Sequence, residues 1–459
     1  MDRRFELRKQ ELLAACKVNP STFADALTRL EAFVEPYAAC LHQQVQQRHV
    51  REYVQGLLSH LARKNGEAIA YLHDQDRKAV QHFIGLARWD HEPMLTLLAT
   101  QVAAAIGTAA GVLVFDPSGF AKKGKQSVGV ARQWIGRQGK VDNGQVGVFL
   151  GYVGQQEHAL VDMRLYLPKE WTQDRKRCQK AGVPKEQRRH RTRHILALEM
   201  LDAKGPLLPH GWIAGDDEMG RSTRFRRNLR DRQEHYLLAV PSNTLIRDQQ
   251  APPPPYRGCG RRPTSPWMRV DRWAAALPKE AWTRIEVRAG AKGPLQVDAV
   301  RCRVVARTDT RRAGPEEILV VLRSQDDDGA TKHDYYLAYA SAATPLTEFA
   351  RVAKAEHRIE ECLQRAKSEA GLADYQVRNW LGWHHHQALS MLATWFLVQE
   401  TQRGKKNHPG ANGSASTTVA GLPVGCGFGG QRSRPHGPRL RTAFMSQRIS
   451  SPSSLEKKP

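Results

Sequence analysis

The feature that most limits the fold is a change of hydrophobic period near residue 111. Before it, apolar residues recur at helical spacing, so residues 1–106 are predicted to form a helical N-terminal region. After it, the apolar runs are of strand type, and a strand–helix–strand alternation follows. The predicted strands are residues 111–115, 145–153, 158–167, 211–215 and 235–241, with helices over 192–203 and 221–231. This order predicts an α/β fold, with a mixed sheet covered by helices.

Composition shifts divide the rest of the chain. The proline run at 252–255 is typical of a stiff linker. We therefore predict a core domain that begins at 107–250, is interrupted by a linker and β-strand-rich insertion over 251–341, and resumes as C-terminal helices over 342–401. Residues 402–459 lose all apolar spacing and are predicted to be a disordered basic tail.

The charge balance indicates the kind of partner. Seventy Lys and Arg against 46 Asp and Glu give a net charge of +24. Such a charge favours polyanions, among which nucleic acid is the commonest partner and acidic lipid the second.

Residues 94–115 carry no charge but are rich in Ala, Thr and Gly, which favours a soluble helix and a buried strand over a membrane span. Seven scattered cysteines without a CxxC pair are expected in a reducing cytoplasm.

Three acidic residues stand out by their context. Asp116 ends the first predicted strand and precedes a lysine-rich loop, Asp216 follows the strand GWIAG, and Glu360 lies two helical turns before Lys367. Carboxylates from different elements can hold two Mg²⁺ or Mn²⁺ ions roughly 3.5–4 Å apart for phosphoryl transfer. Singly, each acid could instead be a turn former, a helix cap or an exposed helix residue. Three neighbouring acids, Asp217, Glu218 and Glu361, would take over these roles if the register is shifted.

Longer motifs around these acids resemble a known family. FDPSGFAKKGKQSVGVARQW, GWIAGDDEMGRSTRFRRNL and the Glu–Lys spacing before LADYQVRNWLGWHHH are similar to the three blocks of DDE-type transposases of bacterial insertion sequences. The resemblance covers roughly residues 80–400. The Tyr and Arg that the family places before its Glu fall on Ala353 and Glu356, which puts contacts to the DNA ends in doubt more than metal binding.

The resemblance implies a fold, a reaction and a location. The fold would be ribonuclease H-like, with a β-rich insertion between the second Asp and the Glu. Asp116, Asp216 and Glu360 would be the catalytic residues and the ligands of two Mg²⁺ ions, with Mn²⁺ as an alternative. The enzyme would cut double-stranded DNA at element ends and transfer the 3′-hydroxyls to target DNA, as a homo-oligomer in the DNA complex. We expect it in the bacterial cytoplasm, associated with the nucleoid, and not at a membrane.

Basic residues near these acids are candidates for holding DNA phosphates. The predicted DNA-binding residues are Lys122, Lys123, Lys125, Arg188, Arg189, Arg191, Arg224, Arg227 and Lys367. Trp171 could stack a base beside the basic segment 172–194, although that segment could equally be a solvated helix. Arg221, Arg226 and Arg230 line the same basic helix after Asp216 and are similarly placed to hold DNA near the metals. His384, His385 and His386 point in different directions on a helix, so we predict that they do not chelate one metal ion.

Two other functions are compatible with the sequence. One is a ribonuclease H-like nuclease that cuts DNA without strand transfer, and the other is a non-catalytic DNA-binding product of a decayed element. A joining assay separates the first from a transposase, and metal-dependent cleavage excludes the second.

Overall fold

The structure, a computed structural model, describes residues 25–252, 254–256, 258–259, 263–290, 293–325 and 330–407. Most of the tail predicted for 402–459 therefore lies outside the described residues. The helices before the sheet are α2 (Ala26–Ala38), α3 (Gln44–Leu57), α4 (Gly66–Leu72), α5 (Arg77–Gly85) and α6 (Glu92–Ile106). Their apolar stripes are buried at helical spacing, for example Leu30 with Val34. Residues 1–24 of the predicted helical region lie outside the described residues.

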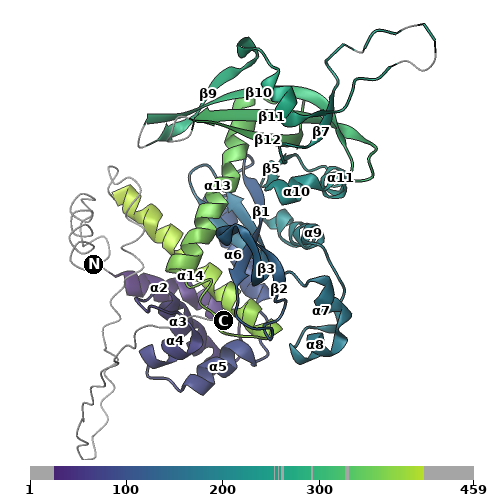
Figure 1. Cartoon of the computed structure of the whole chain (residues 1–459). Coiled ribbons are helices and arrows are strands. Elements are labelled where there is room, and N and C mark those ends of the chain that lie inside the picture. Colours follow the sequence, from purple (N-terminus) through teal and green to yellow (C-terminus); the bar gives the residue numbers. More distant parts are fainter. Residues whose placement is uncertain are drawn as a thin grey trace, which may run out of the picture. The chain divides into compact units, whose positions relative to one another are not determined.

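The centre of the fold is a five-stranded unit within a larger sheet (Figure 1). Its strands are β1 (Val112–Ala121), β3 (Lys140–Val153), β4 (His158–Leu165), β5 (Trp212–Gly215) and β6 (Tyr236–Ala239). Strands β1, β3 and β4 pair antiparallel, whereas β5 pairs parallel with β1 and β6 parallel with β5. The spatial order β4–β3–β1–β5–β6 is that of a ribonuclease H-like core, so the predicted fold class is confirmed.

Strand β1 is longer than the sequence indicated. Residues Asp116–Ala121 continue to pair with β3, so Asp116 lies in the middle of the strand and the prediction that it ends the strand is wrong. The Pro-Ser-Gly sequence after it looked like a turn, but antiparallel pairing with the long strand β3 holds it extended. A further strand that was not predicted, β2 (Ala131–Ile135), pairs with residues 140–144 of β3 and makes a hairpin.

The insertion extends the same sheet. Its elements are β7 (Leu245–Asp248), β8 (Met268–Arg269), α12 (Val270–Ala275), β9 (Thr283–Gly290), β10 (Gly293–Arg307), β11 (Ala313–Gln325) and β12 (Thr331–Tyr339). Strand β12 pairs antiparallel with β6 and joins the insertion to the core, giving a 12-stranded sheet. Strand β7 pairs with β10, so the insertion begins before residue 251. A separate apolar cluster that includes Ile246, Val304 and Leu319 stabilises it.

Helices cover both faces of the core sheet. The remaining helices are α7 (Lys169–Gln173), α8 (Arg175–Lys180), α9 (Arg193–Lys204), α10 (Asp217–Arg221), α11 (Thr223–Asp231), α13 (Leu346–Glu369) and α14 (Trp380–Asn407). The Phe115 ring meets Phe225 of α11 on one face. On the other face, a Cβ on Gly151 would contact Ile359 of α13 at 2.4 Å, so β3 and α13 pack closely. Because Val114 pairs with Gly151 and side chains alternate along a strand, Val114 and Asp116 face α13.

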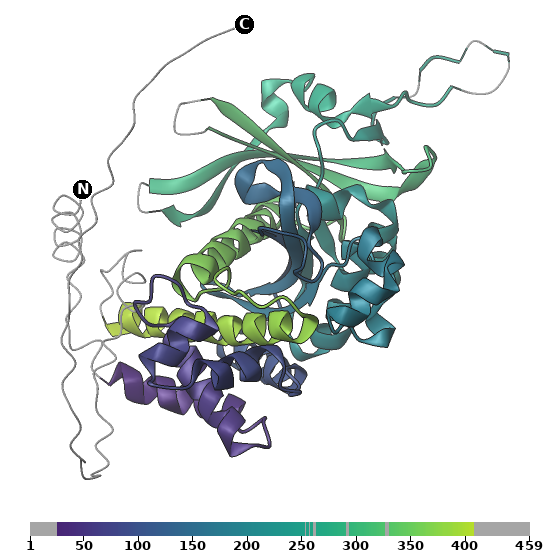
Figure 2. The same cartoon turned by 60° about the horizontal axis from the view of Figure 1, so that its bottom comes forward.

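Helix α14 joins the core to the N-terminal helices, beside which it runs in Figure 2. Its three histidines are buried and have different partners. His384 bonds the carbonyl of Trp380, His385 those of Ile84 and Trp89, and His386 the Tyr53 hydroxyl and the Gly371 carbonyl. The histidines therefore connect helices and do not converge on one point. Within the described part of the chain, no helix is both long and apolar enough to span a bilayer.

Candidate active site

Two of the predicted carboxylates lie side by side because their strands are neighbours. Phe115 of β1 pairs in parallel register with Gly215 of β5, so the next residues, Asp116 and Asp216, occupy adjacent positions. Asp216 leaves the strand and becomes the N-cap of α10, where its carboxylate accepts a hydrogen bond from the Met219 amide at 3.0 Å. The cap fixes this side chain at the carboxyl end of β5.

Helix α13 brings the third carboxylate and a lysine to the same face. Lys367 donates a hydrogen bond to Ser118 Oγ at 2.7 Å, two residues along β1 from Asp116 and on the same side of the strand. Glu360 is two turns earlier on α13 and has a side chain 59% exposed. Its carboxylate lies 3.5 Å from His357 Nδ1, one helical turn earlier. The predicted Glu–Lys spacing therefore places one charge of each sign over β1.

The acids are close enough to perturb one another. Burial raises the pKa of Asp116 to about 6, with a further increase from the charge of Glu360 and a decrease from Lys367. Burial also raises the pKa of Asp216 to about 7, against the lowering effect of the Met219 amide, and the charge of Asp116 adds to the increase. Such crowded negative charge is what a bound cation would stabilise.

The neighbouring acids have other partners. Asp217 forms an ion pair with Arg221 at 2.6 Å, and Glu218 pairs with Arg193. Glu361 lies 3.3 Å from His357 Nε2. Glu218 still raises the pKa of both Asp116 and Asp216, and Asp217 also raises that of Asp216. Asp216 and Glu360 stay the predicted ligands, because Asp216 caps α10 beside Asp116 and the charge of Glu360 raises the pKa of Asp116.

A fourth carboxylate, that of Glu356, lies close to this site and was not predicted as a site residue from the sequence. Glu356 lies one helical turn before Glu360 on α13. Burial raises its pKa well above the usual value, and the charges of Asp216, Glu360 and Asp116 raise it further. The i, i+4 spacing with Glu360 was the available signal. The family resemblance points away from this residue, because the family pattern has Arg at the position of Glu356.

The donor chemistry of these residues suits a hard divalent cation. Carboxylate oxygens are the ligands that Mg²⁺ and Mn²⁺ prefer. In the present conformation, no three Asp, Glu, His or Cys side chains of the described residues are close enough together to hold an ion. The fit therefore rests on the type of donor and on the mutual repulsion seen in the raised pKa values, and the carboxylates would have to approach one another to bind.

The lysines after Asp116 divide into two kinds. Lys122 points inward. Its ammonium donates to the Tyr375 backbone carbonyl at 3.1 Å and lies 3.3 Å from the centroid of the Tyr375 ring. Burial lowers its pKa to about 8. Lys123 and Lys125 are exposed. The lysine loop thus offers Lys123 and Lys125 to a phosphate, whereas Lys122 is engaged within the protein.

The basic segment 172–194 is more internally bonded than its composition suggested. Arg188 donates to the Val183 carbonyl, and Arg191, 11% exposed, pairs with Glu199 at 2.7 Å. Arg189 is 74% exposed. Trp171 is buried, donates to the Val130 carbonyl and lies under the Arg177 guanidinium, so the suggestion that it stacks a base is wrong.

Some arginines of the helix after Asp216 face solvent and others face the core. Arg224 and Arg227 are exposed on α11, as a DNA contact requires. Arg226 is buried and pairs with Glu317 at 2.8 Å, so the proposed DNA contact by this residue is wrong. The reason is the periodicity of α11, which turns Phe225, Arg226 and Leu229 towards the core.

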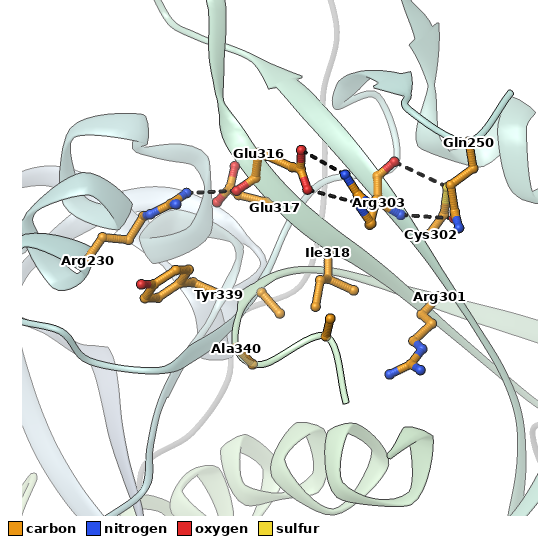
Figure 3. A pocket seen from close by; sticks show the side chains of 12 residues that line it. Arg230, Gln250, Arg301, Cys302, Arg303, Glu316, Glu317, Ile318, Tyr339 and Ala340 are labelled. Carbon is orange, nitrogen blue, oxygen red and sulfur yellow. Dashed lines mark hydrogen bonds and ion pairs between the residues drawn. The ribbon is translucent and has the colours of Figure 1, made fainter. Parts of the chain in front are cut away.

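A cavity of about 420 Å³ lies on the insertion and not at the carboxylates (Figure 3). Three arginines line it, and each has a protein partner. Arg303 pairs with Glu316 at 2.8 Å, Arg230 donates to the Glu316 carbonyl and stacks on Tyr339, and Arg301 donates to the Thr344 carbonyl. These contacts tie β10, β11 and α11 together at the junction of insertion and core.

Comparisons with known proteins show what this chain is similar to. A protein of Microchaete diplosiphon described as a probable transposase for insertion sequence element IS701 is 35% identical over 102 residues, 21% of this chain. The match spans 27% of that relative's length. A solved structure of the piggyBac transposase synaptic complex with hairpin DNA aligns with 87% of this chain and 77% of its own, at 8% identity and a TM-score of 0.38. The family model of the DDE superfamily endonucleases matches residues 36–294, more than half of the chain, and the protein therefore belongs to that superfamily.

Proposed function

We propose that this protein is a transposase that cuts DNA at the ends of a mobile element and joins the 3′-hydroxyls to target DNA. One observation carries the proposal. Asp116 and Asp216, a hundred residues apart in sequence, occupy adjacent positions after the paired residues of β1 and β5. The charge of Glu360 on α13 raises the pKa of Asp116, and that of Asp116 raises the pKa of Asp216. The enzyme would act on double-stranded DNA in the bacterial cytoplasm, as a homo-oligomer on the DNA.

Asp116, Asp216 and Glu360 would hold two Mg²⁺ ions, or Mn²⁺, with Glu356 as a further oxygen donor beside them. When bound, the ions would lower the pKa of an attacking water or hydroxyl and neutralise charge on the phosphate. Strands β1 and β5 fix the two aspartates, while the Ser118 hydrogen bond holds Lys367 beside them. Lys123 and Lys125 would bind the DNA backbone next to the reacting phosphate.

The reaction then consists of two phosphoryl transfers. In the first, water oxygen bonds to phosphorus as the bond to the 3′-oxygen of the element breaks, leaving a 3′-hydroxyl. In the second, that hydroxyl attacks a target phosphodiester and displaces a target 3′-oxygen. No step requires a covalent bond between protein and DNA.

The test is a cleavage and joining assay on duplexes that carry the DNA ends flanking the gene. Asp116→Asn, Asp216→Asn and Glu360→Gln should each lower both rates by at least about a thousandfold and leave DNA affinity within about threefold. Asp217→Asn and Glu361→Gln, the matched neighbours, should stay within about threefold of the wild type. Cleavage without joining would identify a nuclease, and no metal-dependent cleavage by the wild type would overturn the proposal.

A further inference from the structure

The hairpin formed by β2 and the start of β3 carries an exposed apolar pair. Trp134 is 57% exposed and Val141, its register partner, is 50% exposed. All ten tryptophans of the chain lie among the described residues, and Trp134 is the one that is exposed. Because the two residues are register partners, their side chains form one exposed apolar patch and not two isolated ones, and such patches can be contact surfaces. Neither the proposed active site nor the core makes use of this pair.

The hairpin is anchored through its other face. Ile135 is buried and packs over Gly119, where a Cβ would lie 3.1 Å from its methyl group. The Gln133 amide donates to the Gly129 and Gly144 carbonyls at 3.2 and 2.9 Å. Gly139 closes the tip at φ +61°, a conformation that glycine adopts without strain. Trp134 is therefore presented by a fixed element, so little ordering cost opposes its use in binding.

Strand register places the apolar pair on the side of the sheet that carries Asp116. Asp116 pairs with Phe149, Ser118 with Gly147 and Phe120 with Gln145 on β3. Alternate residues of a strand share a face, so Asn143 and Val141 of β3 lie on the same side as Phe149, Gly147 and Gln145. Their partners on β2 are Arg132 and Trp134. Eight residues separate Phe149 from Val141, which is roughly 27 Å along a strand. At about 3.4 Å per base pair, this span corresponds to about eight base pairs of duplex.

Cations surround the pair and connect it to the active site. Lys123, Lys125, Arg132 and Lys140 are exposed at the base and edge of the hairpin. The Asn143 amide donates to the Lys122 and Gly124 carbonyls, and Arg177 donates to the Lys125 carbonyl. The backbone of the lysine loop is thereby held against the hairpin. Among the described residues, only Asp142, which pairs with Lys140 at 3.2 Å, forms an ion pair with any of these four.

We propose that this surface, formed by Trp134, Val141, Arg132, Lys123 and Lys125, binds the DNA duplex about eight base pairs from the bond that is cut. The cations would contact phosphates, and the indole would lie against the sugars and base edges of a groove. DNA fits this surface better than a protein partner because the rim is cationic around a small apolar centre. The inference rests on the proposed function for the location of the cut, but the binding itself does not depend on catalysis.

Binding is measured on the full chain in the Asp116→Asn background, so that no cleavage intervenes. Trp134→Ala should weaken affinity for a fluorescent duplex by about tenfold. Tyr71→Ala, which removes an aromatic ring that is 60% exposed on α4, is the matched control and should change it by less than twofold. Duplex should also shield from acrylamide the fluorescence component that disappears in Trp134→Phe. Unchanged affinity in Trp134→Ala would overturn the proposal.

A second measurement fixes the location. Duplexes are trimmed to about four base pairs beyond the cut bond, on either side in turn. With one of the two trimmed sets, the wild type and Trp134→Ala should bind with equal affinity. A difference in affinity that persists with both sets would contradict the assigned distance.

A shift in the oligomeric state of DNA-free protein by Trp134→Ala, with DNA affinity retained, would show that the surface binds a second copy of the chain instead. If the wild type fails to cleave but Trp134→Ala still weakens binding, the proposed function fails and the binding surface stands.

Discussion

At the scale of single residues, the two aspartates at the centre of the candidate site retain protons to unusually high pH. The pKa is about 6 for Asp116 and about 7 for Asp216, compared with roughly 3.9 in an unfolded chain. The folded state therefore holds protons more tightly than the unfolded state. It follows that the contribution of this pair to stability falls as pH rises from about 4 to about 7. A site arranged in this way is stabilised by whatever neutralises it.

This imbalance predicts the behaviour of an amide variant. In the absence of metal, Asp116→Asn should raise the free energy of unfolding at pH 8 by roughly 1–3 kcal/mol, because it removes a buried charge. The gain should vanish near pH 4, where the wild-type carboxyl is protonated. Added Mg²⁺ should stabilise the wild type by mass action and the variant much less. Urea unfolding in EDTA and in Mg²⁺ checks both points.

The control is Asp217→Asn, which removes a charge at the same turn that is 48% exposed and already paired with Arg221 at 2.6 Å. It should show neither the gain at pH 8 nor a loss of the Mg²⁺ response. If Asp116→Asn is less stable than the wild type at pH 8 without metal, the electrostatic account of the site is wrong.

At the scale of elements, one buried network joins the insertion to the core. Arg226 of α11 pairs with Glu317 of β11 at 2.8 Å, and the Tyr236 hydroxyl of β6 donates to the same carboxylate at 2.6 Å. Arg226→Ala would leave the Glu317 charge buried without its partner and should cost about 3–5 kcal/mol in urea unfolding. Replacing both residues, as Arg226→Met with Glu317→Leu, should restore most of that loss. A double variant as unstable as the single one would show that packing, not charge, holds this junction.

The elements show which parts of the fold could be predicted from sequence. Local periodicity was sufficient for the helical N-terminal region, for α9 and α13, and for the strands of the ribonuclease H-like core. The hairpin of β2 and the assignment of β7 to the insertion could not be obtained in this way, because both depend on pairing with β3 or β10 across the chain. The β2 sequence, ARQWI, is too polar to predict a strand by itself.

The candidate site was also predictable only where local sequence carries the signal. Asp116, Asp216 and Glu360 were found because each lies in a recognisable motif. Periodicity could not show that Glu356 faces the same cluster, since it fixes spacing along α13 but not the side that meets the sheet. It also could not show that Lys122 and Arg191 bind within the protein, because the Tyr375 carbonyl and the Glu199 carboxylate that hold them lie in other segments.

At the scale of the whole molecule, a net charge of +24 predicts strongly salt-dependent DNA binding. If six or more phosphates are contacted, affinity should fall by roughly a thousandfold or more between 50 and 200 mM salt. The structure separates cations that are exposed enough to contribute to this salt dependence from those that are held within the protein. Arg189 is 74% exposed and lies 3.9 Å from Glu199, whereas Arg191 is 11% exposed and pairs with the same carboxylate at 2.7 Å.

The two arginines therefore make a matched pair for testing where the charge acts. If the basic segment touches DNA, Arg189→Ala should lower the slope of log affinity against log salt by about 0.9, the contribution of one phosphate contact, without changing the melting temperature. Arg191→Ala should leave the slope unchanged and lower the melting temperature, because the Glu199 carboxylate in the middle of α9 loses its closest ion-pair partner. Fluorescence anisotropy titrations at several salt concentrations and thermal unfolding measure the two quantities separately. Equal slopes in all three proteins would place the DNA away from this segment, and a lower slope in Arg191→Ala alone would contradict the internal role assigned to that residue.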